Sequence, residues 1–256
     1  MQTNLPSSFL EIESSVWGDP DSPHLQCIYR DQDSFGWYWF KPTSSAKPFY
    51  PDVILDENTQ SLPIRVASIT NLEVGVVANV SGHGRYNFIL DVVFTNGFRE
   101  TDEMMIFLMT SGPKVQGREQ VYDGHNLYSY FTFRTTADNS GVREHVFALE
   151  ASQIPPLINI EKMLQHMAQD GYTPQYLSSI SLGNEVFQGY GLTKISEFTI
   201  TLNGQRISSR TLNRNAARAG VNQQGTEPIQ NWKRWESRND ATLGRPSRFS
   251  YQSYGN

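Results

Sequence analysis

The feature that most constrains the fold is a series of short runs rich in apolar, aromatic and β-branched residues. Each run has the length of a β-strand and is bounded by turn residues. The runs cover residues 9–13, 25–29, 36–40, 64–69, 72–80, 86–94, 102–108, 128–134, 142–150, 176–181 and 198–202. Residues 81–84 (Ser-Gly-His-Gly) predict a hairpin turn, and residues 48–51 a loop. This pattern predicts an all-β sandwich or jelly roll.

One segment departs from the strand pattern. Between about Leu157 and Asp170 the apolar residues recur at helical spacing, with Asn159 as a candidate N-cap and Gly171 as a stop. The residues predicted to face the core are Ile160, Met163, Leu164 and Met167. We therefore expect a single helix, whose methionines pack in the core.

The charge is unevenly distributed along the 256 residues. The formal net charge is −5, but residues 204–256 hold nine Arg and Lys against three Asp and Glu. We expect residues 1–203 to form one acidic β-domain. Residues 204–256 are expected to be a polar, basic extension. It either docks on the acidic domain or binds an anionic partner. An acidic domain argues against nucleic acid as the main partner.

Cysteine and histidine usage limits the chemistry. Cys27 is the only cysteine, so no intrachain disulfide can form, and the five histidines show no metal-ligand spacing. We therefore expect no metal site. No apolar run reaches transmembrane length, and the N-terminus lacks the pattern of a signal peptide. A leader removed beforehand and an intracellular location both remain open at this point.

Three carboxylates interrupt strand-like or glycine-rich segments. Glu103 heads an apolar run, and strand periodicity places it on one face with Met105 and Phe107, while Met104, Ile106 and Leu108 share the core face. An ionised carboxylate without partners is costly to bury, so Glu103 needs either solvent or a function.

Asp91 shows the same irregularity in the preceding predicted strand. Glu185 lies between Gly183 and Gly189, where a solvated strand end is the simpler alternative. Two acidic residues on adjacent strands would raise each other's pKa, an arrangement that is common at functional sites.

Aromatic residues suggest a second kind of function. Aromatic residues make up 12% of the chain, which suits either a β core or a surface that stacks on sugar rings. Trp37 and Trp39 share one face of a predicted strand, so they are either core residues or a stacking platform.

The order of several short motifs resembles glycoside hydrolase family 12. The resemblance covers roughly residues 8–203. It rests on Val16-Trp17-Gly18, Gln26-Cys27, Gly36-Trp37-Tyr38-Trp39, Tyr50-Pro51, Leu90-Asp91-Val92-Val93-Phe94, Glu103-Met104-Met105-Ile106-Phe107, Tyr176-Leu177 and Gly183-Asn184-Glu185-Val186-Phe187-Gln188-Gly189. The chain departs from the family pattern at Ser15, at Val92-Val93 and at Phe107. These departures leave the preferred glucan open.

The resemblance implies a β-jelly roll of two antiparallel sheets with a concave cleft for a β-1,4-glucan. It implies that Glu103 is the nucleophile, that Glu185 is the general acid/base and that Asp91 supports the nucleophile. It also implies a sugar contact at Trp17, and we add Trp37, Trp39, Met105 and Phe107 as candidate substrate-binding residues.

The resulting hypothesis is a retaining endo-β-1,4-glucanase that needs no cofactor and acts as a monomer. The family resemblance further implies that the protein is secreted. Xyloglucan is the alternative substrate. A non-catalytic carbohydrate-binding module on the same fold, and a structural β-sandwich whose basic extension binds a partner, are the alternatives from other classes.

Overall fold

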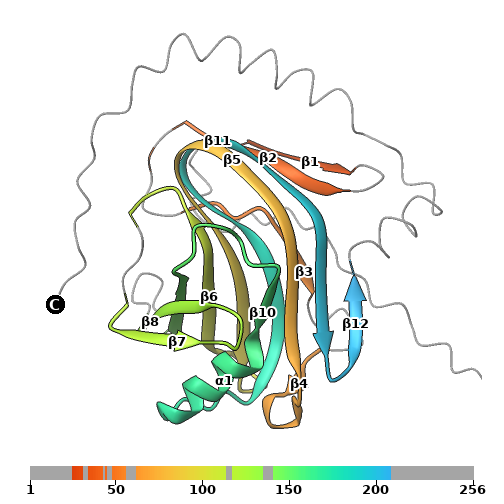
Figure 1. Ribbon diagram of the computed structural model, residues 1–256, viewed down its shortest axis with the longest axis vertical. Helices are drawn as coiled ribbons and strands as arrows, with labels where there is room; N and C mark the ends of the chain where they lie inside the picture. Colours follow the sequence, from red (N-terminus) through yellow and green to blue (C-terminus); the bar gives the residue numbers. More distant parts are fainter. Residues whose placement is uncertain are drawn as a thin grey trace, which may run out of the picture. The chain divides into compact units, whose positions relative to one another are not determined.

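The computed structural model describes residues 25–30, 34–42, 44, 48–55, 62–113, 117–134 and 141–208. Within these ranges the chain is built almost entirely of β-strands, with one α-helix (Figure 1). That helix has ten residues, and the described part of the chain holds no helix long and apolar enough to span a membrane.

The strands cover most of the expected runs, but the predicted strands 72–80 and 86–94 form one strand, as do 176–181 and 198–202, and several short strands are additional. They are β1 (Leu25–Arg30), β2 (Phe35–Lys41), β3 (Asp52–Leu55), β4 (Ile64–Arg65), β5 (Leu72–Thr95), β6 (Glu100–Thr110), β7 (Glu119–Tyr122), β8 (Leu127–Arg134), β9 (Arg143–Leu149), β10 (Leu157–Asn159), β11 (Tyr176–Leu202) and β12 (Gln205–Ser208). A 3₁₀ turn covers Val66–Ser68 and α1 covers Ile160–Gln169. The predicted strand at residues 9–13 lies outside the described residues.

Two very long strands organise the fold. β5 and β11 pair antiparallel over almost their whole length, and Figure 1 shows them arching over together so that each contributes to both layers. The main path of the sheet runs β1-β2-β11-β5-β6-β9-β8-β7. The jelly-roll prediction is therefore confirmed, but the detail of two separate antiparallel sheets is wrong. The layers are joined through β5 and β11, and β6 pairs parallel with β9.

The predicted hairpin turn at residues 81–84 is also wrong. β5 passes through this segment without reversing, and Gly84 pairs with Gly189 of β11. Both glycines have positive φ, at 106° and 111°, a backbone conformation that side chains rarely allow. The turn-like sequence therefore bends two paired strands instead of reversing one, and a bulge lies nearby between Val186 and Gln188.

β6 confirms the predicted alternation of faces. Met104 and Ile106 have no exposed surface and Leu108 is buried, and all three belong to the main hydrophobic core. Glu103 is only partly buried on the other face, which it shares with Met105 and Phe107. The core face of this strand packs against residues of the opposite layer, as the sandwich requires.

α1 forms as expected but starts later. Asn159 is the N-cap, and its side chain accepts a hydrogen bond from the Lys162 backbone N–H at 3.0 Å. Gly171 follows the helix with a φ of 84°. The predicted core residues Ile160, Met163, Leu164 and Met167 are all buried. Residues 157–159, predicted as helix, instead pair with β5 as strand β10.

A short strand follows residue 203, the expected end of the β-domain. β12 (Gln205–Ser208) pairs with the end of β11 and buries Ile207, so ordered strand structure continues past residue 203. Residues 209–256 lie outside the described residues, and the division into a domain and a basic extension stays a prediction.

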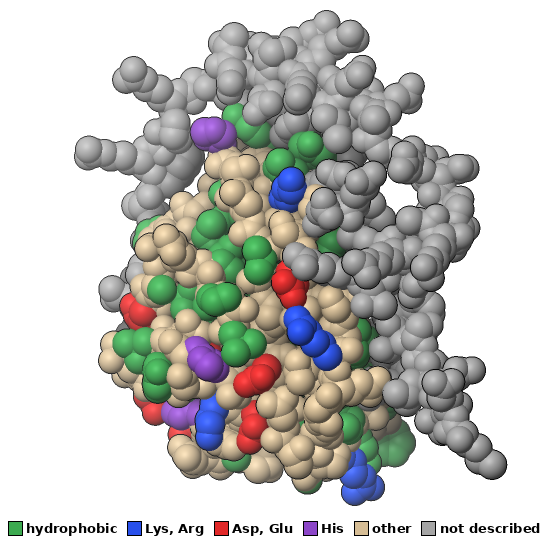
Figure 2. All heavy atoms as spheres, turned by 45° about the vertical axis from the view of Figure 1, so that its right-hand side comes forward, with side chains coloured by type: hydrophobic (Ala, Val, Ile, Leu, Met, Phe, Trp, Pro, Cys, Tyr) green, Lys and Arg blue, Asp and Glu red, His purple; other side chains and the backbone are tan. Residues whose placement is uncertain are grey.

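Figure 2 shows one face of the molecule. On its described part, Lys and Arg side chains lie apart from one another among acidic, hydrophobic and other residues. This face therefore presents no continuous basic track of the kind that a nucleic-acid backbone needs.

A tryptophan fixes the spacing between neighbouring strands. The ring of Trp39 on β2 lies against two paired glycines, Gly191 of β11 and Gly82 of β5, and has no exposed surface. A Cβ atom on Gly191 would stand 2.2 Å from Cζ2 of this ring. The third contact is Tyr86, whose ring centroid is 4.6 Å from that of Trp39.

We predict that Gly191→Ala destabilises the fold by about 1–3 kcal/mol, because an added methyl group must displace a fully packed ring. Urea denaturation followed by tryptophan fluorescence measures this loss. Ser81→Ala, at an exposed position of the adjacent strand, is the control and should change stability by less than about 0.5 kcal/mol. Equal stability of Gly191→Ala and the wild type would contradict the packing described.

Candidate active site

Three adjacent strands bring the predicted carboxylates to one face. Glu103 of β6 pairs with Val93 of β5, and Glu185 of β11 pairs with Asn87 of β5. Paired residues in a ladder point to the same face, and Asn87, Asp91 and Val93 are separated by steps of two along β5. The structure therefore places Asp91, Glu103 and Glu185 on the same face, and the catalytic roles expected of them stay a prediction.

This face has a small apolar cluster of its own. It is separate from the main core and consists of Tyr50, Ile89, Met105, Phe107, Val146 and Ala148, with Phe131 packed against it. Met105 and Phe107 are among the predicted substrate-binding residues. They are 8% and 9% exposed, so they form a floor with little surface available for stacking on a sugar ring.

Asp91 lies beside Glu103 in a mostly desolvated position. Burial raises the pKa of Asp91 well above its usual value, and the charge of Glu103 and a hydrogen bond with it raise the pKa further. Its Oδ1 atom is buried and has no hydrogen-bond partner. A protonated Asp91 can donate this hydrogen bond to Glu103.

Glu185 is held between two opposing influences. Burial raises its pKa to about 7, a hydrogen bond from Asn87 Nδ2 to Glu185 Oε2 at 2.8 Å lowers it, and the charge of Glu103 raises it. The carboxyl group of Glu185 therefore keeps its proton to a higher pH than a solvent-exposed glutamate does. A carboxyl that can both give and take a proton near pH 7 suits general acid/base chemistry.

Asn184 fixes the backbone next to Glu185 from the core side. This fully buried side chain accepts hydrogen bonds from Trp37 Nε1, at 2.9 Å, and from Thr193 Oγ1, and donates to the Asn87 backbone carbonyl at 3.2 Å. It thus ties β11 to β2 and β5 at the point where Asn87 meets Glu185. A rigid scaffold of this kind keeps the carboxyl in place.

Tyr50 lies at the site, although the sequence placed it only in a loop and in one of the motifs of the family resemblance, without a role of its own. Its ring lies over Gly183, where a Cβ atom would stand 2.7 Å from Tyr50 Cζ. Its hydroxyl is 3.4 Å from Ser181 Oγ. Burial raises the pKa of Tyr50 well above its usual value, and the charges of Asp91 and Asp52 raise it further. The available signal was Gly183, because a glycine beside a glutamate leaves room for a neighbouring ring.

The structure places two of the tryptophans that were predicted to contact sugar in the core. Trp37 and Trp39 have no exposed surface and belong to the main core, so their assignment to substrate binding is corrected. Their common face turns inwards because β2 pairs with β11 and covers the sandwich interior. Trp17 lies outside the described residues, and its sugar contact stays a prediction.

Comparisons with known proteins agree with this geometry. No family model matches the chain. The curated protein Endoglucanase S of Pectobacterium parmentieri is 26% identical over 210 residues, covering 73% of this chain and 79% of that protein.

Solved structures share the fold. The native family 12 xyloglucanase from Bacillus licheniformis superimposes with a TM-score of 0.69 at 23% identity, covering 78% of this chain and 95% of the other. The endoglucanase Cel12A from Rhodothermus marinus gives a TM-score of 0.63 at 18% identity, covering 76% and 91%.

The chain is thus similar in sequence to Endoglucanase S and shares its fold with the xyloglucanase and the endoglucanase, which agrees with the family 12 resemblance of its motifs.

We predict that Asn87→Ala raises the pKa of Glu185 above about 7, because it removes the hydrogen bond that favours the ionised carboxylate. Glu103→Gln should act in the opposite direction, because it removes a neighbouring negative charge. Carbon-13 NMR titration of the Glu185 carboxyl measures both shifts. Shifts of the same sign in the two variants would contradict the described balance.

Proposed function

We propose that the protein is a retaining endo-β-1,4-glucanase in which Glu103 is the nucleophile and Glu185 the general acid/base. One observation carries the proposal: Asp91, Glu103 and Glu185 lie on one face of three adjacent strands, and burial raises the pKa of Glu185 to about 7. Glu185 holds its proton up to a pH of about 7, while a neighbouring protonated Asp91 can donate to Glu103 and keep it ionised. Glycoside hydrolysis with retention needs one protonated and one ionised carboxyl.

The proposed reaction uses these groups in two displacements. Glu185 protonates the glycosidic oxygen while Glu103 attacks the anomeric carbon, which gives a glycosyl-enzyme and a shortened glucan. Glu185, now ionised, takes a proton from water, and that water releases the sugar from Glu103. The proton returns to Glu185 in the second step, so no cofactor is required. Retention further expects the two carboxyl groups to be about 5–5.5 Å apart.

Asp91 acts in this scheme through Glu103. Its proposed role is to donate a hydrogen bond to the nucleophile and to hold the charge on it. Asn87 orients Glu185 in the same way, through the 2.8 Å hydrogen bond to Oε2. Both are positioning residues, because neither needs to touch the reacting bond.

The proposed substrate is a cellulose-like β-1,4-glucan, with xyloglucan as the alternative. Both substrate classes occur among the similar proteins, one as an endoglucanase and one as a xyloglucanase. The floor formed by Met105 and Phe107 is apolar and carries no charge that would reject a neutral side branch, but its near-complete burial leaves the stacking contacts to other residues. We keep Trp17 as a proposed sugar contact.

The assembly and location follow from this activity. We propose a monomer, because a single chain supplies all three carboxylates of the site. We also propose that the protein is secreted, because a polymeric glucan cannot cross a membrane intact. The second candidate function is a glucan-binding module without catalysis, which the near-complete burial of Met105 and Phe107 does not favour.

We predict that Glu185→Gln lowers kcat on soluble β-glucan by about 10²–10⁴-fold, because the leaving oxygen is no longer protonated. An aryl β-cellobioside with a good leaving group needs no such proton in the first step. It should therefore restore glycosylation in Glu185→Gln but not in Glu103→Gln.

Glu73→Gln, at a β5 position far along the strand from the site, is the matched control and should keep wild-type activity. Persistent wild-type turnover in both Glu185→Gln and Glu103→Gln would refute the assigned roles. Urea denaturation checks that each variant is folded.

We predict that the first product of wild-type hydrolysis has the β-anomeric configuration, because two inversions restore that of the substrate. Proton NMR of cellulose oligomers, mixed-linkage glucan and xyloglucan during digestion gives both the anomer and the preferred glucan. Initial release of the α-anomer would exclude retention. Tight binding of glucans with no product from any of them would favour the binding module instead.

A further inference from the structure

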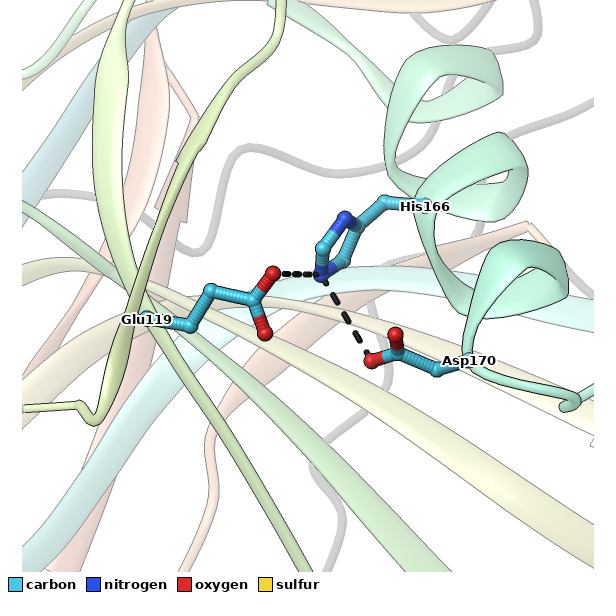
Figure 3. Close-up of side chains that lie close together, drawn as sticks. All are labelled: Glu119, His166 and Asp170. Atoms are coloured by element: carbon cyan, nitrogen blue, oxygen red, sulfur yellow. Dashed lines mark ion pairs between the residues drawn. The ribbon is translucent and has the colours of Figure 1, made fainter.

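A group of three potential metal ligands lies away from the carboxylates of the proposed active site. It consists of Glu119 on β7 and of His166 and Asp170 on α1 and at its C-cap. Figure 3 shows both carboxylates directed at the same nitrogen of the imidazole ring. The separations are 3.5 Å from His166 Nε2 to Glu119 Oε1 and 3.7 Å to Asp170 Oδ2.

These separations are close to those around a tetrahedral metal ion. Zn²⁺ binds imidazole nitrogen and carboxylate oxygen at about 2.0–2.2 Å, so two ligand atoms on a tetrahedron stand about 3.3–3.6 Å apart. All three ligand atoms already lie within 4.8 Å of one another. A rotation of the more exposed carboxylates would complete the arrangement, since the Glu119 side chain is 50% exposed and that of Asp170 35%.

The histidine provides an independent indication. The side chain of His166 is only 14% exposed, and its Nε2 atom is buried without a hydrogen-bond partner. Aromatic contacts hold the ring: Tyr130 lies edge-on at 4.8 Å between centroids, and Phe147 at 6.4 Å. A buried nitrogen that makes no hydrogen bond is unfavourable. A metal ion between the ring and the two carboxylates would satisfy it.

The end of the helix adds electrostatic support. His166 lies in the last turn of α1 and Asp170 is its C-cap. The carbonyl groups at a helix C-terminus carry partial negative charge and favour a nearby cation. The ligand set combines one imidazole with two carboxylates, which suits Zn²⁺ better than Mg²⁺ or Ca²⁺, whose preferred ligands are all oxygens.

We propose that Glu119, His166 and Asp170 form a structural zinc site, with water completing the coordination, that fastens edge strand β7 to α1. β7 ends the sheet and pairs only with β8 among the described strands, so a link to the helix would hold this edge. The proposal is independent of the hydrolase function. Tyr130, which packs on His166, belongs to the main core, on the face of the sheet opposite Glu103.

The test uses the full chain without an affinity tag, after dialysis against EDTA and then chelator-free buffer. Isothermal titration with zinc chloride should give one site per chain. Saturating Zn²⁺, at about 100 times Kd, should raise Tm by about 5–10 °C. Magnesium and calcium chloride at the same concentration should have little effect.

Two variants locate the site. Glu119→Gln and His166→Phe should each weaken Zn²⁺ binding at least about tenfold, since even an outer partner of a metal ligand can contribute that much. His166→Phe keeps a ring against Tyr130. If His166→Phe fails to fold, Glu119→Gln still tests the site, because the Glu119 side chain is half exposed and its substitution leaves the core intact. His125→Gln, at an exposed histidine, is the control and should bind like the wild type.

The proposal is wrong if folded wild-type protein does not bind Zn²⁺ below millimolar concentration. It is equally wrong if Glu119→Gln binds as tightly as the wild type. Either result would leave the three residues as an ordinary ion-pair cluster. Hydrolysis of β-glucan by the EDTA-treated wild type should match that of the zinc-loaded protein at 25 °C, which keeps this test separate from that of the proposed hydrolase activity.

Discussion

The pairing of β5 with β11 extends from Leu72 and Leu202 at one end to Thr95 and Tyr176 at the other. Because both strands arch from one layer into the other, this single ladder joins the two halves of the sandwich and sets the register of all neighbouring strands. The positive-φ glycines at positions 84 and 189 allow the arch. β6 then pairs with the far half of β5, and this pairing brings Glu103 to the face that Glu185 already occupies.

The electrostatics of the site follow from the same register. The ladder places Asn87 opposite Glu185, so the amide that moderates the pKa of this glutamate is supplied by the neighbouring strand. Asp91 lies two residues from Val93, the partner of Glu103, and its side chain is close enough to form a hydrogen bond with Glu103. Burial raises the pKa of both Asp91 and Glu185, and the two hydrogen bonds distinguish their environments. A shift of one residue in either ladder would turn these groups towards the core.

Much of this arrangement could be predicted from local sequence. The alternation in 102–108 correctly separated Met104 and Ile106 from Glu103, because a strand at a sandwich surface alternates faces whatever its neighbours are. The helix and its N-cap Asn159 were equally predictable, since capping is local chemistry. The bend at Gly84 could not be predicted, because the same glycine-rich sequence suits a hairpin turn. The choice depends on a partner strand about a hundred residues away.

The sequence by itself determined the class of fold and the identity of the three carboxylates, because periodicity and short motifs are local properties. Only the tertiary structure decided which residues stand beside them. Trp37 and Trp39 alternate correctly but face the core, because β2 pairs with β11 on the inner side. Tyr50 joins the site because Gly183 leaves room for its ring. Glu119 meets His166 only because the edge strand packs on the helix. These neighbours come from long-range pairing, and no short stretch of sequence records which strands will pair.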